Sequence, residues 1–200
     1  MKILRLLLPL ATLAGSSHAA IIYSGIQNIL IPTTFVGVYI DIDGGGTVAE
    51  EAAGWDINPI FGGEAIANSP SFHPVAATIA LDAPILNLSF GQPVNGSSLF
   101  PSTYPGGFSS SQMHVGNGSG QFVSSSEGYI GFSFTPNLSS VLLYGWIRVD
   151  LSNTSATGLV KDWAYEDSGV AIPAGAVPEP ASAALSTVLA ACLAFRRRRD

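Results

Sequence analysis

Apolar and polar residues alternate along several stretches of the chain, and a period of two is typical of half-buried β-strands. In the segment 129–135, Ile130, Phe132 and Phe134 fall on one face and smaller or polar residues fall on the other. In the segment 35–42, every even position is apolar. Both segments are therefore predicted to be strands that turn one face towards a core.

A β-hairpin is predicted near the end of the alternating region. Residues 141–151 carry apolar residues at most odd positions, and the polar cluster 152–155 follows as a turn. Residues 157–166 then form the returning strand. Three of its residues are predicted to share one face: Leu159, Trp163 and Tyr165. The pattern leaves the register of this hairpin open.

Shorter strands are predicted elsewhere, between prolines that each remove a backbone donor. These candidates are Ile21–Tyr23, Trp55–Ile57, Ala76–Leu81, Ile85–Phe90 and Gly120–Ser124. Residues 92–120 are dominated by Ser, Gly and Pro, which predicts a long loop. The fold expected for residues 20–172 is thus all-β: an antiparallel β-sandwich, jelly-roll-like in arrangement.

The N-terminus is typical of a secretory signal peptide over residues 1–19. Two basic residues precede an apolar run at residues 6–14, and small residues follow it. Cleavage is expected after Ala19, because Ser17 and Ala19 are small at the two positions that a signal peptidase reads. The neighbouring cut, after Ala20, would place the bulkier His18 at the first of these positions.

The C-terminus has three parts in sequence. Residues 173–176 form a small-residue linker, and Val177, Pro178, Glu179 and Pro180 follow it. The uncharged run 181–195 comes next, followed by four arginines: Arg196, Arg197, Arg198 and Arg199. As a helix, the run would be roughly 22 Å long against a bilayer core of about 30 Å. The pattern predicts a short transmembrane helix with its C-terminus in the cytoplasm.

This ending resembles the PEP-CTERM sorting signal of Gram-negative bacteria, with all its parts in order over residues 177–200. The resemblance implies that an exosortase, a membrane enzyme, recognises and processes the tail near Pro-Glu-Pro. Contact with the membrane through residues 181–195 would then be transient. The resemblance also implies delivery to the outer membrane, cell surface or extracellular space, and an association with exopolysaccharide.

Charge excludes one class of partner for the body that remains between the two signals. That body holds two basic side chains, Arg148 and Lys161, against twelve acidic ones, a net charge of −10. Such a field repels phosphate backbones, so nucleic acid is not an expected partner. The one cysteine, Cys192, lies in the terminal apolar run, so the body has no disulfide.

One short motif predicts a cation site. Asp41 and Asp43 alternate in front of three glycines, like the start of a calcium-binding loop. The fifth position of that loop is Gly45 and the twelfth is Ala52, so an EF-hand is not predicted. The two aspartates could meet another acid such as Asp56 around calcium, or they could be solvated residues of a hairpin.

The sequence contains no recognisable catalytic motif. His73 and His114 lie in loop-like sequence and are predicted to be surface residues. The expected function is a non-enzymatic surface or matrix protein with a structural, adhesive or exopolysaccharide-associated role. Two alternatives remain: a calcium-dependent binding module, and a secreted polysaccharide-active enzyme. The enzyme would use a pair of acids, and the candidates are Asp56, Asp150 and Asp162.

Overall fold

The computed structural model describes residues 20–50, 52–80, 83–101, 109–112, 122–123, 126–151 and 156–178. Over these residues the chain forms antiparallel β-sheets, a single 3-10 turn (η1, Phe61–Gly63) and no α-helix. The prediction of an all-β antiparallel fold is confirmed. The predicted signal peptide, residues 1–19, and the predicted transmembrane helix, 181–195, lie outside the described residues.

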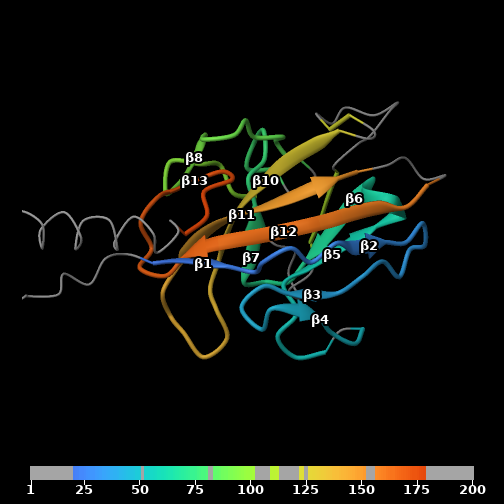
Figure 1. Cartoon of the computed structure of the whole chain (residues 1–200), viewed down its shortest axis with the longest axis horizontal. Helices are drawn as coiled ribbons and strands as arrows, with labels where there is room; N and C mark the ends of the chain where they lie inside the picture. Colours follow the sequence, from blue (N-terminus) through green and yellow to red (C-terminus); the bar gives the residue numbers. More distant parts are fainter. Residues whose placement is uncertain are drawn as a thin grey trace, which may run out of the picture.

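The larger sheet has six strands and is built around the three longest ones (Figure 1). They are β10 (Glu127–Phe134), β11 (Leu143–Asp150) and β12 (Gly158–Glu166). At the edges, β7 (Phe72–Pro74) pairs with β10, while β1 (Ile21–Tyr23) and β2 (Ile29–Ile31) pair with β12. Strands from both ends of the described chain therefore meet in one sheet.

The second sheet takes its five strands from the middle of the chain. In spatial order they are β4 (Gly46–Thr47), β3 (Ile40–Asp41), β5 (Ile57–Ile60), β6 (Ala65–Asn68) and β9 (Ser109–Gln112). A separate pair joins β8 (Pro93–Val94) to β13 (Ile172–Pro173).

One hydrophobic core joins the two sheets. Ile130, Phe132 and Phe134 are buried in it, as the alternation predicts, and they share it with Ile57 and Ile66 of the second sheet. The opposite face of the large sheet carries a second apolar cluster, which residues of β8 and β13 cover. The large sheet is therefore buried on both faces over part of its area.

The predicted hairpin is confirmed as the β11–β12 pair, but one residue of its pattern lies on the other face. Val149 pairs with Val160 and Arg148 pairs with Asp162, so Lys161 is an extra residue in β12. This β-bulge reverses the alternation, because one unpaired residue shifts every later side chain to the opposite face. Leu159 consequently does not share the face of Trp163 and Tyr165.

Four other strand predictions and one loop prediction need correction. The candidate Trp55–Ile57 overlaps the observed strand, Ile57–Ile60, only at Ile57. Over residues 35–42 only Ile40–Asp41 is a strand, because Gly37 turns the chain at φ +66°. Phe35 and Val36 are exposed there. The candidates 76–81 and 85–90 contribute single bridges in place of strands. The predicted loop 92–120 contains β8 and β9.

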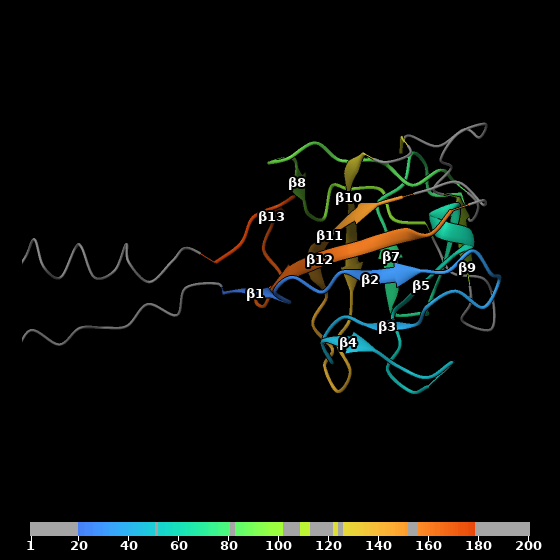
Figure 2. The ribbon, with the colours of Figure 1, turned by 45° about the vertical axis from the view of Figure 1, so that its right-hand side comes forward.

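The predicted linker 173–176 is bonded to the body of the protein. Ala174 is fully buried and exchanges two backbone hydrogen bonds with Gly91 and Gln92. The Trp146 indole N–H donates to the carbonyl oxygen of Ala176 at 3.0 Å. The described chain begins and ends on the same side of the molecule, at β1 and just after β13 (Figure 2).

Candidate cation site

Asp41 and Asp43 lie on a tight hairpin between β3 and β4. The Asp41 carbonyl accepts a hydrogen bond from Gly45 N, and its carboxylate accepts one from Gly44 N at 2.5 Å. A Cβ on Gly44 would lie 2.4 Å from the Asp41 carboxylate, and Gly45 has φ +82°. The glycines that follow the aspartates are thus required for the turn that holds both carboxylates at one end of the molecule.

Asp56 lies beneath this hairpin, immediately before β5. Its backbone N–H donates to Ile40 O at 2.9 Å, in line with the pairing of β5 with β3. Its carboxylate Oδ2 accepts the N–H of Ile42 at 2.8 Å. Only 3% of the residue is exposed. A buried carboxylate therefore forms the floor of the hairpin.

The fold brings these three acids together. One carboxylate oxygen from each of Asp41, Asp43 and Asp56 lies within 4.8 Å of the others. The sequence suggested either a hairpin or a cluster with another acid, and the structure has both. Asp41 and Asp43 lie in a hairpin, and this hairpin packs on Asp56. Glu50, the next acid along this loop, is exposed and outside the cluster.

Asn137 closes the site from a distant part of the chain. Its backbone N–H and its side-chain amide donate to the two carboxylate oxygens of Asp43 at 3.1 and 3.3 Å. The same amide reaches the carbonyl of Gly54 at 3.5 Å. Figure 2 shows the loop between β10 and β11, which carries Asn137, at the same end of the molecule as β3 and β4. Sequence reasoning missed Asn137, since nothing local marks it as a neighbour of Asp43.

The cluster is electrostatically strained as a set of anions. Burial raises the pKa of Asp56 to about 7, with help from the charges of Asp43 and Asp41 and against its hydrogen bond from Ile42. Burial and a hydrogen bond with Asp41 raise the pKa of Asp43. Burial also raises the pKa of Tyr165, and the charge of Asp43 adds to that rise. All three shifts go in the direction that burial and neighbouring negative charges produce, and a cation bound among these groups would oppose them.

The body has no basic side chain to supply that charge. Its sequence holds only Arg148 and Lys161. Arg148 binds Asp162 through two hydrogen bonds, at 2.9 and 2.5 Å, and Lys161 binds Glu127. Both basic side chains are therefore already paired with acids other than the three aspartates. They lie on the outer face of the large sheet, the face turned away from the core that the two sheets share.

The same contacts bear on the acids considered for catalysis. Asp162 accepts both hydrogen bonds of Arg148 and a third, at 2.8 Å, from the Tyr23 hydroxyl. Asp150 lies opposite Glu127 in the β10–β11 ladder. Asp56 belongs to the other cluster, so the three candidates do not form one group. His73 is half-buried, and its Nδ1 is 2.9 Å from the carbonyl oxygen of Pro101. His114 lies outside the described residues.

The described residues include two of the predicted sorting residues and one of the two alanines at the predicted cleavage point. Val177 and Pro178 are described and exposed, as is Ala20 at the predicted cleavage point. Ala19, Glu179, Pro180 and Arg196 to Arg199 lie outside the described residues. In the part of the chain that is described, there is no helix long and apolar enough to span a membrane.

Comparison with known proteins adds no relative. No family model matches the sequence, and neither a curated protein nor a solved structure matches it.

Proposed function

We propose that this chain is an exported surface or matrix protein whose delivered body is a calcium-binding β-sandwich of jelly-roll-like type. The observation that carries the cation site is the convergence of Asp41, Asp43 and Asp56 within 4.8 Å, one of them buried. The role is structural, adhesive or exopolysaccharide-associated. The sorting tail, read by an exosortase, supports delivery of the body to the outer membrane, cell surface or extracellular space.

Calcium suits this donor set for two reasons. All three side chains offer carboxylate oxygens, the ligands that hard divalent cations prefer. Oxygens bound to one Ca²⁺ at about 2.3–2.6 Å lie at most about 5 Å apart, which agrees with the spacing of the three carboxylates. The carbonyl of Gly54 adjoins the site through Asn137, and water would supply the other ligands.

The architecture supports a sandwich because two antiparallel sheets share one core. One sheet combines strands from both ends of the described chain, the other uses strands from its middle, and their side chains meet in a single core. The enzyme alternative is less well supported. The Asp162 carboxylate already accepts hydrogen bonds from Arg148 and from the Tyr23 hydroxyl, so its oxygens are occupied within the fold.

Calcium binding is tested by calorimetric titration and thermal unfolding of the exported protein after treatment with EDTA. We expect one bound Ca²⁺ per chain and a raised unfolding temperature. Asp56→Asn should abolish both effects, whereas Glu50→Gln, in the same loop but outside the cluster, should keep them. A protein with the same melting curve in calcium and in EDTA would contradict the proposal.

Sorting is tested separately by mass spectrometry of the exported protein. We expect a mature N-terminus at Ala20 and loss of the C-terminal arginines. A mature protein that still ends in Arg196 to Asp200 would rule out processing of the tail and leave the cation site unaffected.

A further inference from the structure

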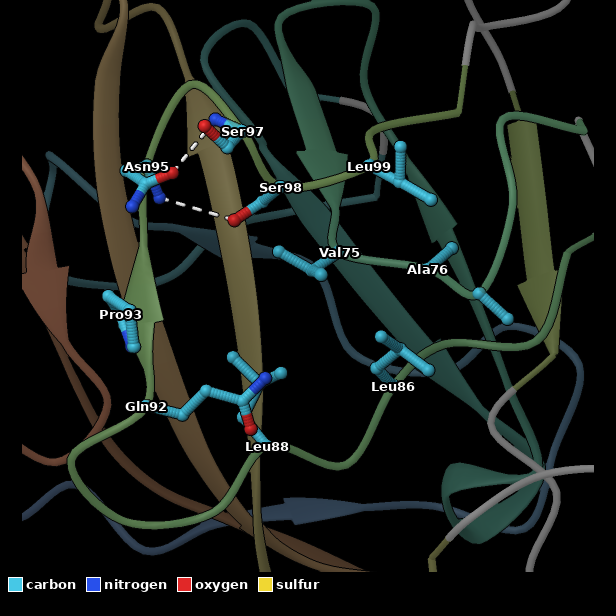
Figure 3. Close-up of a pocket in the computed structure, with 11 residues that line it drawn as sticks. Val75, Ala76, Leu86, Leu88, Gln92, Pro93, Asn95, Ser97, Ser98 and Leu99 are labelled. Carbon is cyan, nitrogen blue, oxygen red and sulfur yellow. Dashed lines mark hydrogen bonds between the residues drawn. The ribbon is translucent and has the colours of Figure 1, made fainter.

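A second candidate site lies on the opposite side of the large sheet from the shared core. It is a pocket of about 320 Å³ between the chain that follows β7, the segment 86–88 and the turn that follows β8 (Figure 3). This volume is at the lower end of the range for small-molecule sites, about 300–1,000 Å³. None of its lining residues belongs to the aspartate cluster.

The side chains that line this pocket are uncharged. Among the described residues that line it there is no Asp, Glu, Lys, Arg or His, although the body carries a net charge of −10. Figure 3 shows Gln92 and Asn95 along one side and the aliphatic Leu86 and Leu99 on the other. A charged ligand would lose its hydration here and gain no counter-charge, so the pocket favours an uncharged one.

The backbone of the pocket is already hydrogen-bonded within the protein. Ala76 N donates to Leu99 O at 3.0 Å, Leu86 N to Val75 O at 3.0 Å, and Leu88 N to Tyr129 O at 2.9 Å. A peptide that binds by adding a strand needs free backbone donors and acceptors on the protein. These three donors are not free for that purpose, which favours recognition through side chains.

Hydrogen bonds to the backbone orient two side-chain amides of this pocket. The Asn95 Oδ1 accepts the N–H of Ser97 at 2.8 Å, and the Gln92 Oε1 accepts the N–H of Ser89 at 3.1 Å. Because each amide oxygen is already bonded to a backbone donor, each NH₂ group is left to donate to a ligand. The Ser98 hydroxyl, which accepts from Asn95 N, adds another donor at the rim.

We propose that this pocket binds one uncharged sugar ring of a neutral glycan. The hydroxyl and ring oxygens of a sugar accept hydrogen bonds from the amides of Gln92 and Asn95, and its C–H face packs on Leu86 and Leu99. The proposal gives a ligand class to the exopolysaccharide-associated role proposed above, and rests on it. It requires no cation, so it can fail or hold independently of the aspartate cluster.

The test is saturation-transfer NMR and calorimetric titration of the exported protein with hexasaccharides of glucose (α- and β-linked), mannose and galactose, and with alginate as the charged comparison. We expect at least one neutral hexasaccharide to bind, equally well in calcium and in EDTA, and alginate not to compete. Calcium binding without glycan binding would overturn this proposal alone, and glycan binding without calcium binding would overturn the cation site alone.

Two variants and one control locate the binding. Leu99→Trp fills the pocket from a position that is 47% exposed, and should weaken binding by tenfold or more. Asn95→Asp keeps the oxygen that accepts from Ser97 but loses the NH₂ group, and should weaken binding by about tenfold with an unchanged melting temperature. Val170→Trp, exposed and outside the pocket, should change it by less than about twofold.

The proposal is overturned if none of the neutral hexasaccharides binds. It is also overturned if Leu99→Trp and Asn95→Asp bind as the unmodified protein does, or if alginate competes. If no saccharide binds, an apolar peptide that binds the unmodified protein and binds Leu99→Trp at least tenfold more weakly would assign the pocket to a protein partner instead.

Discussion

Two buried carboxylates in this protein lie in opposite electrostatic environments. Asp162, on the outer face of the large sheet, is 1% exposed and is held by Arg148 and the Tyr23 hydroxyl. Asp56, beneath the β3–β4 hairpin, is 3% exposed and is surrounded by two further carboxylates. One charge is neutralised within the fold, and the other needs a charge from outside.

This difference follows from how few cations the body has. Removing a carboxylate from water is costly unless a positive charge or several donors compensate for it. Arg148 and Lys161 both lie on the face of the large sheet that holds Asp162 and Glu127. The network around Asp162 is therefore complete in the isolated protein, while the aspartate cluster is complete only with a bound cation or a proton.

The largest expected effect on stability comes from removing the ion pair between Arg148 and Asp162. Arg148→Met leaves Asp162 buried without a counter-charge, so the free energy of unfolding should fall by about 3–5 kcal/mol. Urea denaturation at pH 7 measures this change. Replacing Asp162 as well, by Asn, should restore part of the lost stability, because it removes the uncompensated charge. If Arg148→Met were as stable as the unmodified protein, the network around Asp162 would not be a stabilising feature.

The second largest effect on stability is expected from the titration of Asp56 in the aspartate cluster. The pKa of Asp56 is about 7 in the folded protein against 3.8 for the ordinary group. Because the folded value is the higher one, the charged form opposes folding. In EDTA its destabilisation should be absent below pH 4, grow between pH 4 and 7 and level off at roughly 4 kcal/mol above that.

The difference in unfolding free energy between the unmodified protein and Asp56→Asn measures this titration. We expect the variant to gain on the unmodified protein as the pH rises from 4 to 7. A difference that does not change over this range would show that Asp56 titrates in the folded protein as it does in water.

A smaller effect should appear in calcium binding itself. Protons and calcium compete for Asp56, since only the ionised carboxylate is a good ligand. Below pH 7 the ionised fraction falls about tenfold per unit, so the dissociation constant for calcium should be about tenfold higher at pH 6 than at pH 8. Calorimetric titration at the two values tests this, and an affinity that does not change with pH would place the ion elsewhere.

The smallest effect is expected at the exposed end of the neutralised network. The hydrogen bond from Lys161 lowers the pKa of Glu127, yet the Glu127 side chain is 45% exposed. An ion pair in contact with water contributes about 0–1 kcal/mol, so Lys161→Met should change the unfolding free energy by no more than that. A loss as large as that of Arg148→Met would mean that Lys161 also neutralises Asp162.

The sequence predicted the parts of this structure that depend on local pattern. Alternation identified the faces of β10 and β11, because successive side chains on a strand point to opposite faces. It failed in β12, where the bulge at Lys161 changes the count, and in 35–42, where Gly37 turns the chain. The strands β2, β4, β6, β7, β8, β9 and β13 were missed because they are only two to four residues long.

The candidate sites divide in the same way. The sequence pointed to Asp41 and Asp43 because both lie in one short motif, and it named Asp56 only as an example of a further acid for the site. Asn137 is 94 residues from Asp43, and only the packing of two loops at one end of the molecule makes them partners. The neutral pocket had no signal at all, since its lining is drawn from ordinary aliphatic and polar residues.

By itself, the sequence determined the all-β class, the strong negative charge of the body and the scarcity of cations, since each depends on composition or local period. The predictions for the two terminal signals also rest on the sequence alone. Only the tertiary structure decided which acid received Arg148 and which three were left together. That choice depends on strand order and on the register of β11 against β12, both of which arise from contacts between residues distant in the chain.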